Sequence, residues 1–425
     1  MATFSAEVYQ NEFLPDGGSD VHAIVTVTCE GAGEAGRSGS GDAGEIVMVD
    51  TSGSMGKEKI LAVQQAAAAA LDQVLDGVWF AVIAGNHEAW LAYPTTSGLG
   101  MARMDDQTRA AAKYAIGDFE PKGGTAMGTW LRLATQVFAT VPGLAQKHAI
   151  LLTDGINQHE TPQQLTANIE GARGQFQCDC RGVGSDWQVA EVRRIATTLL
   201  GSVDLIASAE SMAADFEQIM RQSMGRGVAE AWLRVWAPQG AQVLFVRQVS
   251  PTVDDLTGRR AEVNALTSAY PTGSWGDESR DYHVAVRLPA KAVGQEQLAA
   301  RVQLAIGGDV AAQGLVKAMW SSDDTLTTRI DPAVAHYTGQ AELAEAIQDG
   351  LAAKASGDTA TATTKLGRAV QLAAETGNED ATTRLRKIVE IDDAATGKVQ
   401  LRRSVDKLDE MALDTASTKT TRVKK

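Results

Sequence analysis

The chain has 425 residues, of which 44% are hydrophobic and 22% are charged, and its formal net charge is −14. This composition is typical of a folded globular protein that is long enough for two or three domains. The acidic balance argues against broad nucleic-acid binding, which depends on a surplus of Lys and Arg. No apolar run reaches the roughly 18 residues that a bilayer span needs, so we expect no membrane segment.

The N-terminus and the cysteines indicate the compartment. Met1–Asn11 lacks the basic start and the apolar core of a signal peptide. Cys29, Cys178 and Cys180 form an odd, sparse set, which suits a reducing environment better than a disulfide framework. We therefore expect a cytoplasmic protein.

Two strands are predicted before residue 30, at 3–13 and 21–29. In the second, alternation is combined with β-branched residues, as is typical of a half-buried strand. Residues 30–44 are acidic and rich in glycine, which favours a mobile link. We assign residues 1–44 to N-terminal strands that belong to a β-sandwich formed further along the chain.

From Glu45 to about Gly225, short apolar strands alternate with amphipathic helices. This alternation is typical of a doubly wound α/β sheet, in which ligands bind at the carboxyl ends of the strands. We therefore predict an α/β domain over residues 45–225. The expected strands are 45–50, 78–84, 88–93, 148–152, 176–183 and 203–207, and the expected helices are 57–76, 105–116, 127–140, 161–173, 187–200 and 211–224.

Over residues 226–335 the pattern changes to strands alone. Five strands here and the two at the N-terminus together predict a seven-stranded β-sandwich. This arrangement implies that the α/β domain is inserted into the sandwich. The five expected strands are 232–236, 243–249, 282–288, 301–306 and 316–320.

Residues 336–410 have helical patterns and contain no aromatic side chain after Tyr337. Ser356-Gly357-Asp358 separates two predicted helices, 340–355 and 359–375, and a third is predicted at 379–390. One helical hairpin buries too little surface to be stable alone, so we expect it to pack on the sandwich or on a partner. Residues 411–425 are polar and are expected to form a flexible tail.

The first candidate site segment follows the strand that ends at Asp50. Asp50, Ser52 and Ser54 form the pattern Asp-x-Ser-x-Ser, and their side chains offer hard oxygen donors of the kind that Mg²⁺ prefers. The same residue types are also common in Asx turns and helix caps. Alone, this segment fits a metal site and a plain turn equally well.

Two further segments place oxygen donors in comparable positions. Thr125 follows Gly123-Gly124 at a tight turn before a helix, and Asp154 follows the apolar strand 148–152. Because the carboxyl ends of parallel strands share one edge of a sheet, we expect Asp50 and Asp154 to lie close together. The five candidate metal ligands are Asp50, Ser52, Ser54, Thr125 and Asp154.

This set, in the order DxSxS, T, D, resembles the metal-ion-dependent adhesion site of the von Willebrand factor A domain, here of a bacterial cytosolic type. The resemblance covers about residues 45–225, and every position of the motif is filled. It implies that Ser52, Ser54 and Thr125 contact the metal directly. It also implies that Asp50 and Asp154 act largely through bound water or hydrogen bonds. The implied cation is Mg²⁺, with Mn²⁺ and Ca²⁺ as alternatives.

The resemblance further implies an interaction function. Few charged ligands would leave the cation electrophilic and one coordination position open, which an Asp or Glu carboxylate of a protein partner could fill. Mg²⁺ suits such a site because it normally keeps several waters and needs few protein carboxylates. The A-domain family also allows a role as an adaptor for an AAA+ ATPase.

The alternative class is a hydrolase that uses the metal to activate water. The sequence shows no paired acid and base beside the site, since His148 and His159 flank the third segment without an evident partner. His87-Glu88 lacks the second histidine of a zincin, and no P-loop motif is present. Cys178 and Cys180 fit buried strand cysteines better than a metal or redox pair. We therefore predict a non-enzymatic interaction protein.

The expected tail contains four threonines with basic neighbours, as an acceptor segment for a Ser/Thr kinase would. A phosphothreonine there could be recognised by an Arg-lined module such as a forkhead-associated domain, which would make the protein a signalling scaffold. The plainer interpretation is a solubilising tail. The four residues are Thr415, Thr418, Thr420 and Thr421.

Overall fold

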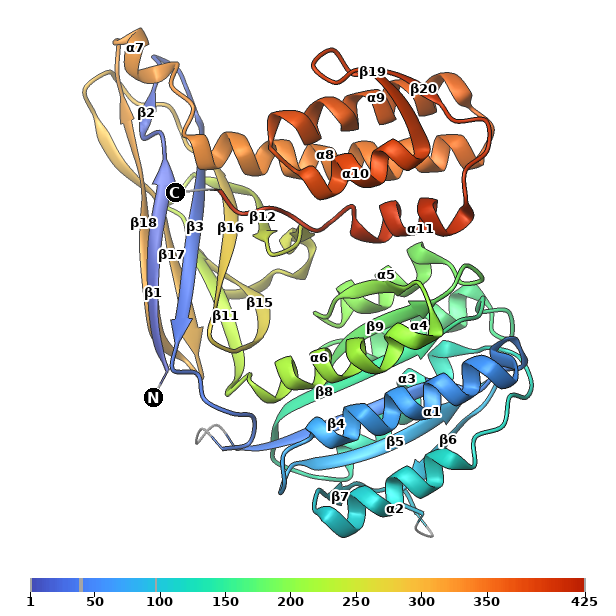
Figure 1. The fold of residues 1–425 in the computed structure, drawn as a ribbon. Coiled ribbons are helices and arrows are strands. Elements are labelled where there is room, and N and C mark those ends of the chain that lie inside the picture. The colour runs from blue at the N-terminus through green and yellow to red at the C-terminus, as the bar shows by residue number, and fades with distance from the viewer. Residues whose placement is uncertain (1, 38–40, 96–97, 424–425) are drawn as a thin grey trace. The chain divides into compact units, whose positions relative to one another are not determined.

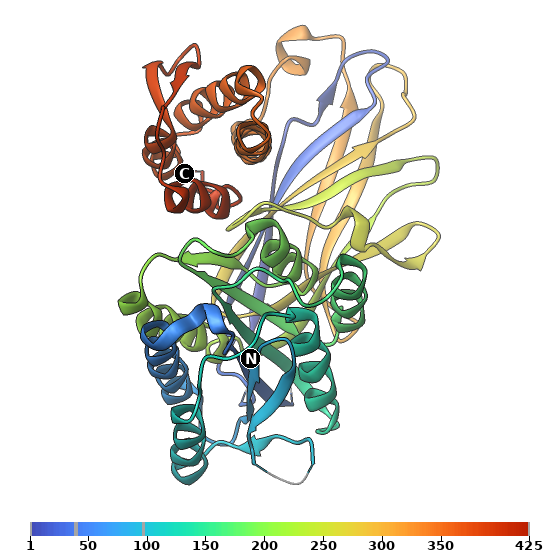
Figure 2. The same cartoon turned by 90° about the vertical axis from the view of Figure 1, so that its right-hand side faces the viewer.

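The computed structural model describes residues 2–37, 41–95 and 98–423, and its elements are shown from two sides in Figure 1 and Figure 2. The chain divides into two compact units. The first contains residues 31–230 and 273–277, and the second contains residues 2–30, 231–272 and the chain from 278 onward. In the described part of the chain, no helix combines the length and the apolar character that crossing a membrane requires.

The first unit is built around a sheet with the strand order β10-β9-β8-β4-β5-β6, and β7 also pairs with β5. The central strand β4 is parallel to both β5 and β8 and is buried from Ala43 to Asp50. Its near-continuous apolar run is what a strand covered on both faces requires. The strands are β4 (Asp42–Asp50), β5 (Trp79–Gly85), β6 (Ala89–Tyr93), β7 (Ala102–Arg103), β8 (Leu144–Thr153), β9 (Gln177–Val183) and β10 (Val203–Ile206).

Helices cover both faces of this sheet, as the sequence predicts for a doubly wound α/β domain (Figure 1). On one face α1 (Gly56–Gln73), α2 (Asp106–Gly117) and α6 (Met212–Met224) share a hydrophobic core with β4 and β5. On the other face lie α3 (Met127–Ala139), α4 (Pro162–Ala172) and α5 (Val189–Thr198) (Figure 2). Capping boxes begin two of the helices, Asp105 with Thr108 at α2 and Thr161 with Gln164 at α4.

The second unit contains a β-sandwich. Among the described residues one sheet has the order β1-β3-β16-β12-β13 and the other the order β14-β15-β11-β17-β18-β2. The two sheets pack closely, since a Cβ added at Gly314 of β18 would lie 2.5 Å from Val8 of β1. The strands are β1 (Thr3–Gln10), β2 (Phe13–Leu14), β3 (Asp20–Glu30), β11 (Val228–Trp236), β12 (Gln242–Ser250), β13 (Asp254–Asp255), β14 (Ala261–Asn264), β15 (Thr267–Trp275), β16 (Glu278–Arg287), β17 (Glu296–Ile306) and β18 (Asp309–Trp320).

The N-terminal strands belong to this sandwich. β3 pairs antiparallel with β16 along its length, from Asp20 opposite Arg287 to Cys29 opposite Glu278. The prediction of seven strands was too low, because the described residues form a five-stranded and a six-stranded sheet. The sequence hides β15 because this strand contains Pro271 and Gly273, residue types that strands normally avoid.

A helical segment follows the sandwich in the chain. The helices α9 (Thr359–Glu375) and α10 (Glu379–Ile388) lie close to the predicted ranges, whereas α8 (Pro332–Ala355) ends as predicted but begins eight residues earlier than the expected 340. The sequence did not reveal α7 (Asp324–Thr327), the β-hairpin of β19 (Val389–Asp393) and β20 (Lys398–Leu401), or α11 (Lys407–Ala416). These elements are short, and the buried residues Val399 and Leu413 pack into the same core as α8 and α9.

The predicted flexible tail, residues 411–425, is ordered as far as it is described. Leu413 is buried in α11, and the segment Ser417–Val423, here called the strap, lies against the sandwich. Thr420 donates through its hydroxyl to Val249 O at 2.7 Å, and Thr421 accepts a hydrogen bond from Gln340 at 3.0 Å. Residues 424–425 lie outside the described residues. The prediction of a flexible tail failed because the polar sequence of this segment does not show that distant parts of the chain offer it hydrogen-bond partners.

The link predicted to be mobile, residues 30–44, is likewise held where it is described. Ala32 N donates to the Asp277 carboxylate at 2.7 Å, and Ala35 N donates to Met224 O at 2.8 Å. Ala35 is buried in the core of the first unit. Residues 38–40, the centre of the predicted link, lie outside the described residues.

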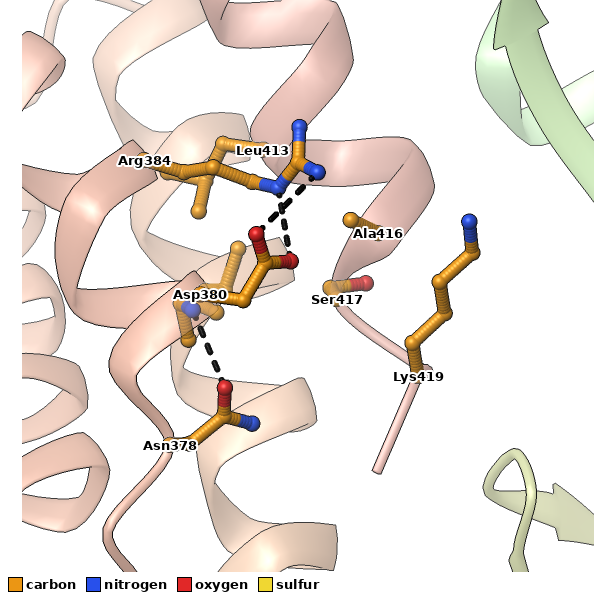
Figure 3. A pocket seen from close by; sticks show the side chains of 9 residues that line it. Asn378, Asp380, Arg384, Leu413, Ala416, Ser417 and Lys419 are labelled. Atoms are coloured by element: carbon orange, nitrogen blue, oxygen red, sulfur yellow. Dashed lines mark hydrogen bonds and ion pairs between the residues drawn. The ribbon is translucent and has the colours of Figure 1, made fainter. Parts of the chain in front are cut away.

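Among the described residues, the second unit contains a small pocket and a larger cavity. A pocket between α10, α11 and the strap has room for about 10 Å³, enough for a single water molecule. Figure 3 shows Lys419 across this pocket from the Asp380–Arg384 ion pair. A larger cavity of about 450 Å³ is lined by β3, β16, the start of α8 and the strap, including Asp281, Tyr337 and Arg422. None of the five predicted metal ligands lines either cavity.

Candidate metal centre

The first segment of the predicted site begins where β4 ends. Asp50 is fully buried, and its carboxylate accepts a hydrogen bond from Ser52 N at 2.7 Å, which is the geometry of an Asx turn. The 3₁₀ turn η1 (Gly53–Met55) follows, and the hydroxyls of Ser52 and Ser54 lie 2.8 Å apart. The segment therefore forms the turn that the sequence allowed, and this turn also brings together the oxygen donors that a metal site would need.

The other two segments reach the same place. Ser54 Oγ donates to Asp154 Oδ1 at 2.7 Å, so the first segment and the third are in direct contact. A Cβ added at Gly155 would lie 2.7 Å from Thr125 Oγ1, 3.2 Å from Ser54 Oγ and 3.6 Å from Asp50 Oδ2. The lack of a side chain at Gly155 thus leaves a small space that three donors surround. All five predicted residues lie together at the carboxyl edge of the sheet.

Backbone hydrogen bonds hold the loops in this arrangement. Gly53 N donates to Gly123 O at 2.8 Å, and Lys122 N donates to Thr51 O at 2.7 Å, which joins the first segment to the loop before Thr125. Thr51 N donates to Gly85 O at 2.7 Å, and this bond fixes the chain after β4 against the end of β5. Because these backbone groups are hydrogen-bonded to one another, the relative positions of the loops that carry the oxygen donors are fixed by the fold.

Two histidines that the sequence analysis did not assign to the site lie beside the Gly123-Gly124 turn. A Cβ at Gly124 would be 1.8 Å from the His159 ring, and a Cβ at Gly123 would be 2.4 Å from His87 Nδ1. The two imidazole centroids are 5.8 Å apart, and both side chains are exposed. Glycine at both positions lets these rings close over the turn. The approach of two loops that are distant in sequence produces this pair, so no local pattern could have revealed it.

Electrostatics at the site is dominated by buried carboxylates. Burial raises the pKa of Asp50 to about 6, although hydrogen bonds from Ser52 and Thr153 act in the opposite direction. Asp154 is fully buried, and its Oδ2 lies 2.5 Å from Lys59 Nζ. Asp50 is held by hydroxyl and amide groups without a cation beside it in those contacts. Removing such a carboxylate from water is unfavourable, and an added cation would relieve the cost.

The donor set fits a hard divalent cation. Over residues 2–37, 41–95 and 98–423, no three His, Cys, Asp or Glu side chains gather in a way that could hold a metal. A metal here must therefore depend on the hydroxyls of Ser52, Ser54 and Thr125 together with the two aspartates. Mg²⁺ accepts oxygen ligands, keeps several waters and needs few carboxylates, so the residues present fit it.

His148 lies outside the site. The sequence suggested that it has no partner, but the structure gives it two. It is buried in β8, where Nδ1 lies 2.7 Å from Glu45 and Nε2 lies 3.0 Å from Asp179. Burial alone would lower the pKa of His148, but the two carboxylates raise it to about 9. Five strand residues, roughly 16 Å, separate it from the carboxyl end of β8. Cys178 and Cys180 in β9 are buried free thiols, as expected.

The first unit is a doubly wound α/β domain, and five oxygen-bearing residues at the carboxyl edge of its sheet form a candidate cation site. The family model described as von Willebrand factor type A domain matches residues 45–204, and the model described as von Willebrand factor type A C-terminal domain matches residues 371–417. A solved structure, the von Willebrand factor type A protein from Catenulispora acidiphila, is 47% identical, with 99% of this chain and 97% of that chain covered and a TM-score of 0.93. The chain belongs to the von Willebrand factor type A family.

More distant relatives show how far the likeness extends. The ArnB paralog VWA2 from Sulfolobus acidocaldarius is 14% identical over 98% of both chains with a TM-score of 0.57, which shows a shared fold alone. An uncharacterized protein of Synechocystis is 28% identical over 215 residues, 50% of this chain and 49% of the relative. The chain thus spans about half the length of that curated relative. Domains of this family often bind a metal ion and generally mediate metal-dependent protein–protein interactions.

Proposed function

We propose that this protein is a Mg²⁺-dependent interaction module that captures an Asp or Glu carboxylate of a protein partner. The observation that carries the proposal is that Thr125, Ser54 and Asp50 surround the small space at Gly155, while Ser52 and Asp154 lie within hydrogen-bond distance of Ser54. Ser52, Ser54 and Thr125 would hold the cation directly. Asp50 and Asp154 would act through water or hydrogen bonds. When bound, the cation supplies a position that an incoming carboxylate can occupy.

The residues of the chain support binding rather than turnover. Asp50 is held by Ser52 and Thr153, and Asp154 by Ser54 and Lys59, so neither carboxylate is placed as a base toward solvent. Mn²⁺ and Ca²⁺ are alternatives for the same donors. We include a cytoplasmic location in the proposal, on the ground that Cys29, Cys178 and Cys180 are buried free thiols.

The test is a pull-down with and without Mg²⁺ from the native cell. The bait proteins are the wild type, Asp50→Ala and Thr125→Ala, with Glu58→Gln, an exposed change on α1, as the matched control. We expect a partner to be recovered only by the wild type and the control, and only with Mg²⁺. Mass spectrometry of that partner would also show whether an AAA+ ATPase is present, as an adaptor role requires. Equal recovery in every condition would overturn the proposal.

A metal-dependent hydrolase is the second candidate, and one observation favours it. His87 and His159 lie beside the Gly123-Gly124 turn, where an imidazole could accept a proton from water, and a bound cation would supply Lewis acidity. Turnover of phosphoester or peptide substrates that is lost in both Asp50→Ala and His159→Gln would establish this candidate. Partner capture that persists in His159→Gln would favour the interaction module.

A signalling role for the tail requires a different state of the protein. Thr415 is buried, and the hydroxyls of Thr420 and Thr421 are hydrogen-bonded within the second unit. A kinase, and then a forkhead-associated domain, could reach Thr418, Thr420 and Thr421 only after the strap leaves the sandwich, and Thr415 only after α11 opens. We propose that the strap stays docked and unmodified. Intact-mass measurement of the protein from its native cell would contradict this if it showed added phosphate.

A further inference from the structure

Lys59 brings a positive charge to the edge of the candidate site. It lies near the start of α1, and its Nζ is 2.5 Å from Asp154 Oδ2. A Cβ added at Gly184, just after β9, would lie 4.0 Å from Nζ, which places the ammonium group between the ends of β8 and β9. The side chain of Asp154 is 0% exposed and that of Lys59 is 31% exposed. Lys59 therefore pairs with a fully buried carboxylate and keeps a route to solvent.

The two oxygens of Asp154 have different partners. Oδ1 accepts from the Ser54 hydroxyl at 2.7 Å, which belongs to the proposed donor set. Oδ2 accepts a hydrogen bond from Lys59, a residue outside the proposed donor set. A cation bound beside Ser54 would therefore lie close to a carboxylate that already has a cationic partner. Two positive groups that share one buried carboxylate repel each other, and the repulsion is strong where little water screens it.

We propose that Lys59 is a resident counter-cation, which weakens divalent-cation binding and couples it to capture of a carboxylate. This inference rests on the proposed function of the site. When both are ionised, Asp50 and Asp154 bring two negative charges, and Lys59 returns one positive charge. A divalent cation then leaves one positive charge in excess while Lys59 stays. An incoming carboxylate supplies the missing negative charge, so the cation and the partner bind better together than apart.

A plain structural ion pair is the competing interpretation. In that case Lys59 only neutralises Asp154 and fixes α1 on the sheet, and its loss lowers stability without changing the affinity for the cation. The two interpretations therefore predict different effects of removing Lys59 on the affinity for the divalent cation. A counter-cation that is removed must make the divalent cation bind more tightly.

The experiment is isothermal titration of the full chain with Mn²⁺, followed by competition with Mg²⁺. The variants are Lys59→Met, Lys59→Arg and Lys57→Met. Lys57 is exposed two residues earlier on α1, so its change removes the same charge without touching Asp154. We expect Lys59→Met to bind Mn²⁺ about tenfold more tightly than the wild type, equal to about 1.4 kcal/mol. Lys59→Arg and Lys57→Met should stay within about twofold.

A second titration in acetate tests the coupling, with chloride as the reference and the free Mn²⁺ concentration corrected for acetate binding. Acetate should tighten Mn²⁺ binding to the wild type and have less effect on Lys59→Met. Unchanged affinity in Lys59→Met, or an equal gain in Lys57→Met, would overturn the inference and leave the proposed function standing. If the wild type binds neither Mn²⁺ nor Mg²⁺, as we expect of Asp50→Ala, both the inference and the proposed function are overturned. Circular dichroism of each variant ensures that folded proteins are compared.

Discussion

The hydroxyl of Thr153 donates a hydrogen bond of 2.6 Å to Asp50 Oδ2, which joins the last residue of β8 to the last residue of β4. Together with the amide of Ser52 it gives both oxygens of the buried carboxylate a donor. These bonds do not offset the loss of water, since the pKa of Asp50 is raised to about 6. Asp50 is thus ordered but electrostatically strained in the absence of a cation.

Asp50→Asn is therefore expected to stabilise the metal-free protein. A pKa that is raised from 3.8 to about 6 means that ionisation disfavours the folded state at pH values above 6. The shift corresponds to a penalty of up to about 3 kcal/mol, which disappears as the pH falls below 3.8. Denaturant unfolding in EDTA at pH 7.5 should show a gain in the variant, and this gain should shrink toward pH 5.

The same variant should lose its response to the cation. Mg²⁺ is expected to raise the melting temperature of the wild type, because it binds the folded state alone, and to leave Asp50→Asn unchanged. Thr153→Val is a useful comparison, since it removes a donor to Asp50 without removing the charge. A metal-free Asp50→Asn protein that is less stable than the wild type would contradict this account of the site.

His148 is expected to stay protonated at neutral pH. With Glu45 and Asp179 on its two nitrogens, its pKa is raised to about 9 from 6.5. Its contribution to stability is complete below pH 6.5 and is lost as the pH rises through about 9, and it amounts to up to about 3 kcal/mol. NMR of labelled histidines should show one imidazole that titrates near pH 9. That signal should be absent from His148→Gln.

Substitutions at two glycines test whether an added Cβ costs more stability beside a backbone atom than beside a side chain that can move. A Cβ at Gly201 would lie 1.9 Å from Cys178 O, which is part of β9 and cannot move away. Gly201→Ala should therefore cost about 1–3 kcal/mol or more. The three atoms nearest to a Cβ at Gly124 all belong to the exposed ring of His159, which can rotate, so Gly124→Ala should stay within about 0.5 kcal/mol of the wild type. Thermal unfolding measures both, and equal costs would show that the His159 ring is fixed.

Arg422 links the strap to the sandwich through a buried carboxylate. Its Nε and Nη2 lie 3.2 Å from the oxygens of Asp281, which also accepts from Thr26 and Tyr337. Because Asp281 stays buried in Arg422→Ala, the loss of a charged donor should cost about 1–3 kcal/mol. Arg384→Ala, which breaks the exposed pair with Asp380, is the control and should cost at most about 1 kcal/mol.

Proteolysis provides a second readout of the strap. Trypsin should cleave slowly after Lys419 in the wild type and faster in Arg422→Ala, because cleavage requires the segment to leave its hydrogen bonds to Val249 and Pro251. Rapid cleavage at Lys419 in both proteins would show that the strap is not held as the structure describes.

The sequence predicted the elements of the first unit well because its signals are local. The apolar run that ends at Asp50 and the alanines of α1 favour the same strand and helix that packing requires. The sandwich was harder to predict. β3 receives its partner β16 from far along the chain, and β15 carries Pro271 and Gly273, so neither pairing nor register follows from the strands alone.

The five donors of the candidate site could be predicted because Asp-x-Ser-x-Ser is a local pattern and strand ends share an edge. Lys59 could not, because its contact with Asp154 depends on the angle at which α1 leaves the turn. The partners of His148 were missed for the same reason, since Glu45 and Asp179 stand on neighbouring strands and are distant in sequence. Tertiary contacts between distant segments are the information that a single chain pattern lacks.

The pairing of β3 with β16 has a consequence for biosynthesis. Between Glu30, where β3 ends, and Glu278, where β16 begins, about 250 residues must be translated, which takes roughly 12–50 s at about 5–20 residues per second. During this time β1 and β3 exist as an unfinished hairpin with an unpaired apolar edge, the kind of nascent segment that aggregates or recruits a chaperone. The first unit, residues 31–230 and 273–277, is translated entirely within that interval and can fold meanwhile. Slower translation of residues 231–272 would therefore lengthen the exposure of the N-terminal strands without delaying the domain that carries the candidate cation site.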